Sequence, residues 1–68
     1  MKNFSVRLRE LRIEKGLSQQ KLADAIGIKR HTVADWELRR TEPDISYIIS
    51  LARFFDITTD VLLGIKEY

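Results

Sequence analysis

Apolar residues recur every three or four positions along most of the chain, the spacing that gathers them on one face of an α-helix. The first such stripe consists of Phe4, Leu8 and Leu11. Asn3 or Ser5 is the expected N-cap of this helix, and Gly16 is its expected end. No segment alternates apolar and polar residues over the length of a strand. The pattern therefore predicts an all-α fold.

Two further helices are predicted directly afterwards, with only a short link between them. Ser18 is a suitable N-cap for the earlier helix, and Gly27 is its expected end. The later helix spans about residues 29–38. Their inner positions are Leu22, Ala23, Ile26, Ile28, Val33 and Trp36. Because the link is too short for a hairpin with parallel axes, the two helices must cross steeply, and residues 18–38 are predicted to form a helix-turn-helix.

The remaining chain predicts two more helices and a short tail. Pro43 disfavours a helical conformation just before it, and Asp44 then caps a fourth helix. Its expected buried face is Ile45, Ile48, Leu51, Ala52 and Phe55. After a break at residues 56–57, Thr58 caps a fifth helix that ends near Gly64, and residues 65–68 form a tail. The whole sequence, residues 1–68, is predicted to be one domain.

The charge is distributed unevenly, although the formal net charge is only +2. Residues 2–40 carry ten basic and five acidic side chains, whereas residues 41–68 carry two basic and five acidic ones. A basic half suits a polyanionic partner, either nucleic acid or an anionic membrane surface, and plain solubility would also account for it. The outer face of the third helix favours DNA, because it is polar, rich in hydrogen-bond donors and narrow enough for a major groove.

Length and composition exclude several classes of protein. The 68 residues make one small domain, and 44% hydrophobic residues are too many for a disordered chain. Cysteine is absent, and no apolar run approaches the roughly 20 residues that cross a bilayer. Disulfide scaffolds, secreted proteins and transmembrane proteins are therefore not expected, and the lack of cysteine fits the cytoplasm.

Short sequence pieces in this order carry a family resemblance: Gly-Leu-Ser-Gln at 16–19, Leu-Ala at 22–23, Gly-Ile at 27–28, Trp-Glu at 36–37, Pro43 and Leu-Leu-Gly at 62–64. Each piece alone is unspecific, but their joint order and spacing are specific. From Val6 to Gly64 the chain resembles the DNA-binding domain of the phage repressor and Cro group, the XRE-type regulators. The resemblance implies a compact five-helix fold like that of the lambda repressor. It also implies a sequence-specific, double-stranded-DNA-binding transcriptional regulator, expected to be a repressor.

The resemblance also implies a role for each matching position. Base contacts are expected from Lys29, Arg30, His31, Thr32 and Asp35. Phosphate contacts are expected from Gln19, Arg39, Arg40 and Thr41. Arg12 and Glu37 match an internal ion pair that braces the third helix against the first. The family often carries glycine where this chain has Arg39, so the third helix is expected either to run longer or to be capped differently.

Some positions have a second interpretation that needs no DNA. Asp35 would pair with His31 or Arg39 one turn away, an interpretation we favour over a base contact, and Trp36 is expected in the core. The same fold would also serve a protein-interaction module such as an antitoxin or adaptor. Exposed Leu38 would suit that alternative, as would the apolar set Tyr47, Phe54, Ile65 and Tyr68. The apolar set suits the seam of a homodimer better.

No enzyme is predicted, because the sequence offers no nucleophile with a base, no phosphate-binding glycine loop and no metal-ligand cluster. No cofactor or metal is expected. The expected partner is a near-palindromic DNA operator, bound by a homodimer that is weak off DNA, with half-sites roughly 10 base pairs apart. A bacterial or phage-encoded cytoplasmic protein fits this assignment. Both a complete Cro-like protein and the binding domain of a longer repressor remain consistent with it.

Overall fold

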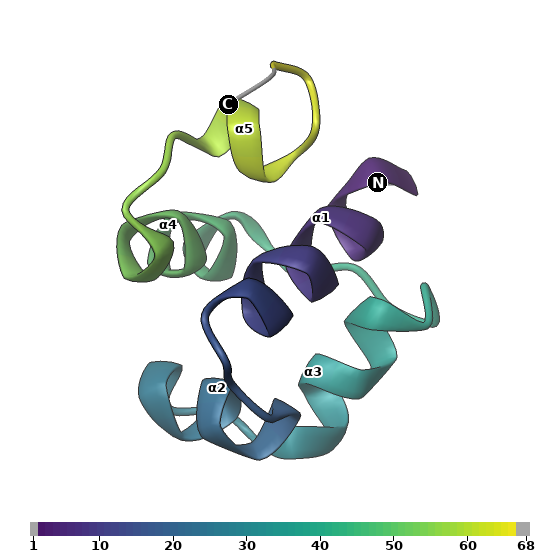
Figure 1. Cartoon of the computed structure of the whole chain (residues 1–68). Coiled ribbons are helices and arrows are strands. Elements are labelled where there is room, and N and C mark those ends of the chain that lie inside the picture. The colour runs from purple at the N-terminus through teal and green to yellow at the C-terminus, as the bar shows by residue number, and fades with distance from the viewer. Residues whose placement is uncertain (1, 67–68) are drawn as a thin grey trace.

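The computed structural model describes residues 2–66, which form five helices and no strand (Figure 1). The helices are α1 (Lys2–Glu14), α2 (Gln19–Ile26), α3 (Arg30–Glu37), α4 (Ile45–Phe55) and α5 (Thr59–Leu62). This confirms the all-α prediction within the described residues. The suggestion that Tyr68 belongs to a dimer seam falls outside them. No described helix is both long and apolar enough to span a membrane.

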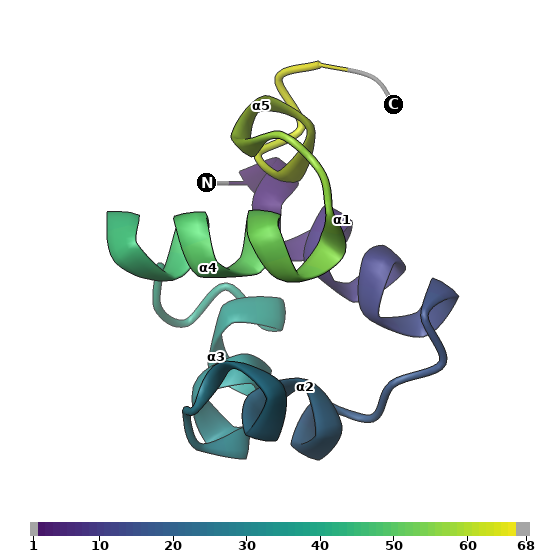
Figure 2. The ribbon, with the colours of Figure 1, turned by 90° about the vertical axis from the view of Figure 1, so that its left-hand side faces the viewer.

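The helices are stacked in three tiers, and this stacking places α3 at one end of the molecule. In Figures 1 and 2, α5 lies at the top, α1 and α4 cross the middle, and α2 and α3 lie at the bottom. The two views are related by a turn about the vertical axis, so the order of the tiers is the same in both. The helix-turn-helix is thus carried at the end opposite α5.

Three helices begin where the sequence predicts, because a side chain caps each one. The hydroxyl of Ser18 accepts the backbone N–H of Lys21 at α2, and the carboxylate of Asp44 accepts that of Tyr47 at α4. Thr58 does the same at α5. Each contact satisfies a backbone donor that has no partner inside the helix. Gly27 ends α2 in the left-handed conformation with φ 75°, a conformation that glycine adopts at little cost.

Two expectations about helix ends and faces are wrong. Helix α1 already begins at Lys2, so Asn3 and Ser5 lie inside it and neither caps it. Ser5 is instead buried. Ile45 does not belong to the buried face of α4, because its side chain is 77% exposed. It lies in the first turn of α4, beyond the reach of the core, and Ile49 one turn later is also exposed.

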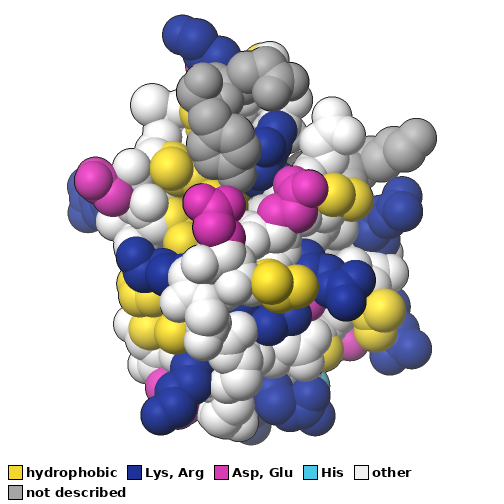
Figure 3. Space-filling model, in the orientation of Figure 1, with side chains coloured by type: hydrophobic (Ala, Val, Ile, Leu, Met, Phe, Trp, Pro, Cys, Tyr) yellow, Lys and Arg dark blue, Asp and Glu magenta, His cyan; other side chains and the backbone are white. Residues whose placement is uncertain are grey.

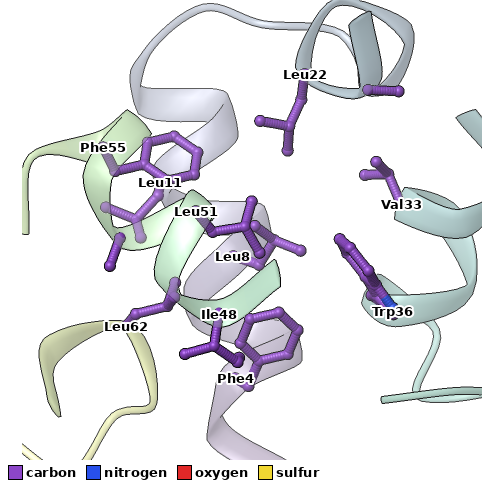
Figure 4. Close-up of a cluster of buried hydrophobic side chains, with 12 residues drawn as sticks. Phe4, Leu8, Leu11, Leu22, Val33, Trp36, Ile48, Leu51, Phe55 and Leu62 are labelled. Carbon is purple, nitrogen blue, oxygen red and sulfur yellow. The ribbon is translucent and has the colours of Figure 1, made fainter. Parts of the chain in front are cut away.

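The core joins all five helices and fixes α3 to the rest of the domain (Figure 4). Its largest members are Phe4, Leu8, Leu11, Leu22, Val33, Trp36, Ile48, Leu51, Phe55 and Leu62. Trp36 is 2% exposed, which confirms its predicted place in the core. Its ring lies 6.3 Å from that of Phe4 and 5.6 Å from that of Tyr47, measured between centroids. These aromatic contacts anchor the C-terminal half of α3 against α1 and α4.

The end of α3 has Arg39 at the position where the resemblance leads one to expect glycine. The helix ends at Glu37, Leu38 is its C-cap, and Arg39 adopts φ 61°. A longer helix is therefore wrong, and the helix end keeps the left-handed conformation typical of glycine, here adopted by Arg39. Arg39 takes the left-handed conformation in which an L side chain is crowded and glycine is not.

Candidate nucleic-acid interface

Helix α3 has one side fixed in the core and one side open. Val33 is fully buried. On the open side, the predicted base-contacting residues Lys29, Arg30 and His31 are exposed, while Thr32 and Asp35 are half-buried. Since 100° separates successive helical residues, His31 and Asp35 lie opposite Val33, and Arg30 lies on the flank toward α2. The structure therefore presents five predicted side chains around the free side of α3 and its start.

The first residue of α2 is brought directly to the first residue of α3. The side-chain carbonyl oxygen Oε1 of Gln19 accepts a hydrogen bond from Nη1 of Arg30 at 3.2 Å. The amide Nε2 of Gln19 donates to Oε1 of Glu37 at 3.1 Å. A predicted phosphate-contacting residue and a predicted base-contacting residue thus touch each other. They do so although 11 positions separate them in the sequence.

Glu37 also forms the ion pair expected with Arg12. Nε of Arg12 lies 2.7 Å from Oε2 of Glu37, and Nη2 lies 3.1 Å from Oε1, so the pair is bidentate. The two side chains are only 12% and 4% exposed. Nη1 of Arg12 donates to the carbonyl oxygen of Leu17 at 2.8 Å. One guanidinium therefore ties α1 to the end of α3 and to the segment that leads into α2.

The loop after α3 carries the remaining predicted phosphate contacts, Arg39, Arg40 and Thr41, and all three are exposed. Nη1 of Arg40 lies 3.8 Å from Oδ1 of Asp35. The pairing expected for Asp35 with His31 or Arg39 is therefore wrong. The left-handed turn at Arg39 folds the chain back, so that the backbone N–H of Arg40 donates to the carbonyl oxygen of Asp35 at 2.9 Å. That return brings the Arg40 side chain to the carboxylate.

Basic side chains lie over the whole visible face of Figure 3, its upper part included. In Figure 3, most of the acidic side chains lie over the upper half, and Lys and Arg predominate at the lower end, where Figure 1 places α2 and α3. In the sequence, residues 2–40 hold ten of the twelve basic side chains, and four of these ten lie on α1. The exposed basic side chains of this end, Lys21, Lys29, Arg30, Arg39 and Arg40, favour the approach of a polyanion.

Two of the apolar residues expected in a dimer seam pack against the core of the same chain instead. Tyr47 and Phe54 are partly buried against the core. The Phe54 ring contacts that of Phe55 at 5.0 Å between centroids, and Nζ of Lys15 lies 5.4 Å from the Phe54 centroid. The exposed apolar side chains on α4 and in the tail are instead Ile45, Ile49 and Ile65. Of the proposed seam, only Ile65 is both described and strongly exposed.

Sequence reasoning did not find the contacts of Gln19 with Glu37 and Arg30, nor the Leu17 carbonyl oxygen as a partner of Arg12. No sequence pattern around a glutamine at a helix start indicates that its partner lies 18 residues further along the chain. Within the described residues, no group of three or more His, Asp or Glu side chains is placed to hold a metal ion. The side chains that the structure brings together around α3 are donors and acceptors of hydrogen bonds.

Comparison with known proteins gives a consistent assignment. The profile of a family described as helix-turn-helix matches residues 8–62. The SPbeta prophage-derived uncharacterized HTH-type transcriptional regulator YonR of Bacillus subtilis (strain 168) is 38% identical over 60 residues, which cover 88% of this chain and 56% of YonR. This chain spans about half the length of such relatives.

Two solved structures share the fold. A transcriptional regulator from Listeria innocua superposes with a TM-score of 0.86 at 32% identity, covering 96% of this chain and 61% of that one. The restriction-modification controller protein C.AhdI from Aeromonas hydrophila gives a TM-score of 0.80 at 41% identity, covering 87% and 89%. With the family match over most of the chain, these findings show that this protein belongs to the helix-turn-helix family of XRE-type regulators.

Proposed function

We propose that this chain binds double-stranded DNA at specific sequences and acts as a transcriptional regulator, with α3 in the major groove. The observation that carries the proposal is the two-sided environment of α3. Val33 and Trp36 are buried on its inner side, whereas His31 is exposed on the opposite side and Arg30 on the flank toward α2. A helix that is packed into the core on one side and exposed on the other can enter a major groove without rearrangement of the domain.

The base contacts fall to the residues around the free side of α3. Arg30 can donate in bidentate fashion to O6 and N7 of guanine. His31 faces the groove one position later, and Lys29 reaches a base or an adjoining phosphate from the helix start. Thr32 suits a thymine methyl group or a phosphate. Asp35 can accept from N4 of cytosine through Oδ2, while Arg40 lies 3.8 Å from its Oδ1.

The phosphate contacts lie on both sides of that helix. Gln19 stands at the start of α2, where unpaired backbone N–H groups and the helix dipole favour an anion. Arg39, Arg40 and Thr41 lie in the loop at the other end of α3 and are exposed. Contacts at both ends would fix the orientation of α3 on the duplex, while its side chains distinguish the bases.

Repression is the regulatory role that needs least from the chain, because a bound protein blocks access to an overlapping promoter by occupancy alone. Residues 1–68 would act as one helix-turn-helix domain, in a bacterial cytoplasm where chromosomal or phage DNA is present. The family is one of regulators, and we assign this chain no catalytic role.

The DNA-bound form would be a homodimer on a near-palindromic operator, with half-sites roughly one helical turn apart. Ile45, 77% exposed, and Ile49, 41% exposed, lie one turn apart on α4 and offer an apolar surface for it. Such a small surface favours a dimer that is weak in free solution and firmer on DNA.

Selection of bound duplexes from a random pool tests the proposal. We expect a recovered motif with two-fold symmetry and half-sites about 10 base pairs apart. Sedimentation of the chain with one selected duplex should then give two chains per duplex. A pool that stays random after repeated rounds would reject sequence-specific binding. It would favour the protein-interaction module, for which Leu38, 61% exposed, is available.

A further inference from the structure

The imidazole of His31 stands on the open side of α3 without a partner in the protein. It is exposed and lies opposite the buried Val33. Among residues 2–66 its side chain makes no hydrogen bond and no ion pair. By contrast, Arg30 donates to Gln19 and Asp35 faces Arg40. A bound duplex would therefore supply the first hydrogen-bond partner of this ring.

The charged groups around His31 lie on its own helix and in the loop that follows. Lys29 and Arg30 precede it, and Asp35 follows one helical turn later. Nη1 of Arg40 lies 3.8 Å from Oδ1 of Asp35, so this arginine partly balances the carboxylate. The imidazole thus has cations before it in the chain and a partly balanced anion after it.

The helices packed on the other sides of α3 leave the imidazole to solvent. Where α1 meets α3, Arg12 and Glu37 pair with each other. On α2, Asp24 accepts a side-chain hydrogen bond within the same helix, and Lys21 is exposed. Nothing in the described part of the chain therefore fixes the protonation state of His31. The pH of the solvent and a bound duplex set it.

Protonation changes what an imidazole can bind. The neutral ring has one N–H donor and one acceptor nitrogen, whereas the cation has two donors and no acceptor. Histidine is the side chain whose charge ordinarily changes between about pH 5 and about pH 8. The sequence has one histidine and no cysteine. The hydrogen-bonding character of the proposed reading surface therefore changes with pH at one position.

The bases respond differently to that change. In the major groove guanine presents two acceptors, N7 and O6, whereas cytosine presents the donor N4 and adenine presents one acceptor and one donor. A neutral imidazole can donate to guanine, or it can accept from cytosine or adenine. The cation can only donate, and its bond to guanine is charge-assisted and therefore stronger.

We infer that His31 couples base preference to pH, so that guanine gains and cytosine loses at the contacted position as pH falls. This inference rests on the proposed function, because it needs α3 in the major groove. The DNA phosphates also attract an imidazolium, but they carry no sequence information. A pH dependence that differs between sequences therefore requires contact with a base edge.

The test uses the full chain and a duplex selected by the wild-type protein. His31→Ala first identifies the base pair at which discrimination depends on His31. Kd is then measured at about pH 7.5 and about pH 5.5 for duplexes that carry each base in turn at that position. Carboxyl groups ordinarily stay ionised over this range.

Two variants serve as matched controls. His31→Gln keeps a donor and an acceptor but does not titrate. His31→Arg is a cation that only donates at every pH. Helical circular dichroism at both pH values checks that each variant retains the fold.

We expect the ratio of Kd for the cytosine duplex to Kd for the guanine duplex to rise by about five-fold in acid, because a neutral hydrogen bond becomes charge-assisted. The ratio should not depend on pH in His31→Gln. His31→Arg should favour guanine equally at both pH values.

Several results would overturn the inference and leave the proposed function intact. A wild-type ratio that stays constant or falls in acid rejects the coupling, and an equal gain on every duplex leaves His31 near phosphate only. Equal shifts in wild type and His31→Gln place the titrating group elsewhere. A His31→Ala variant that loses discrimination nowhere removes the base contact. A wild-type protein that selects no sequence overturns the proposed function as well.

Discussion

The hydroxyl of Ser5 donates a hydrogen bond to the carbonyl oxygen of Trp36 at 2.7 Å, across 31 positions of sequence. Ser5 is 5% exposed, so this contact is made in the interior. The carbonyl lies in the last turn of α3, where the helix supplies no partner for it. The backbone N–H of Arg39 also donates to it, at 3.2 Å. Ser5 thus links the N-terminal part of α1 to the end of α3.

Ser5→Ala should lower the free energy of unfolding by about 1 kcal/mol, because a buried hydrogen bond is lost while one weaker donor remains. Urea titration followed by helical circular dichroism measures this. Ser50→Ala on the exposed side of α4 is the control and should be neutral or slightly stabilising. Equal stability of Ser5→Ala and wild type would show that the contact contributes nothing net.

Breaking the Arg12–Glu37 pair should affect folding before it affects DNA binding. Arg12→Met or Glu37→Met should each lower the free energy of unfolding by about 3 kcal/mol, because one charge is left buried without its partner. The double variant Arg12→Met/Glu37→Met should be less destabilised than the sum of the two, since no buried charge remains. Simple additivity in urea unfolding would contradict a coupled, buried pair.

Arg39→Gly should separate stability from binding. Glycine adopts φ 61° without crowding. The free energy of unfolding should therefore rise by about 0.5–1 kcal/mol, after allowance for the greater conformational entropy of the unfolded chain. DNA affinity should fall, because a proposed phosphate contact is lost. Arg39→Ala is the control, because it removes the charge but leaves a residue with a Cβ atom in the left-handed conformation. It should lose affinity without gaining stability, and a stabilised Arg39→Ala would reject backbone strain as the cause.

Asp44 should make stability depend on pH in acid. Its pKa is lowered from 3.8 because the carboxylate accepts a hydrogen bond from the Ser46 hydroxyl and another from the Tyr47 backbone N–H. A carboxyl with a lowered folded-state pKa stabilises the protein above its unfolded pKa, and this is lost as pH falls through the folded value. The stability difference between wild type and Asp44→Asn should therefore shrink from about pH 5 to about pH 3. A constant difference across that range would show that ionised Asp44 does not stabilise α4.

Arg40→Ala should weaken binding to selected and random duplexes alike, as expected for a phosphate contact. The slope of log K against log salt should decrease in size by about one, the contribution of one released counterion. Arg53→Ala, on the exposed side of α4, is the control and should leave the slope unchanged. An unchanged slope in Arg40→Ala would remove this residue from the phosphate contacts.

Local signals placed most of the helices correctly. Ser18, Asp44 and Thr58 cap helices as predicted, because a cap depends only on neighbours three residues apart. The start of α1 was missed, since Asn3 and Ser5 are both acceptable caps and the choice between cap and helix interior depends on distant packing. Ser5 is held inside the helix by Trp36, and Ile45 is exposed because the core does not extend to the first turn of α4 on that side.

The sequence by itself determined the periodic apolar faces, the caps and the motif of residues 18–38, because these depend on residue type at short spacing. The family resemblance also supplied the Arg12–Glu37 pair, which the structure contains. Only the tertiary structure decided that Gln19 lies between Glu37 and Arg30, and that Asp35 meets Arg40. Those contacts depend on how α2 crosses α3 and on the left-handed turn at Arg39. Both are set by packing between segments that local sequence does not relate.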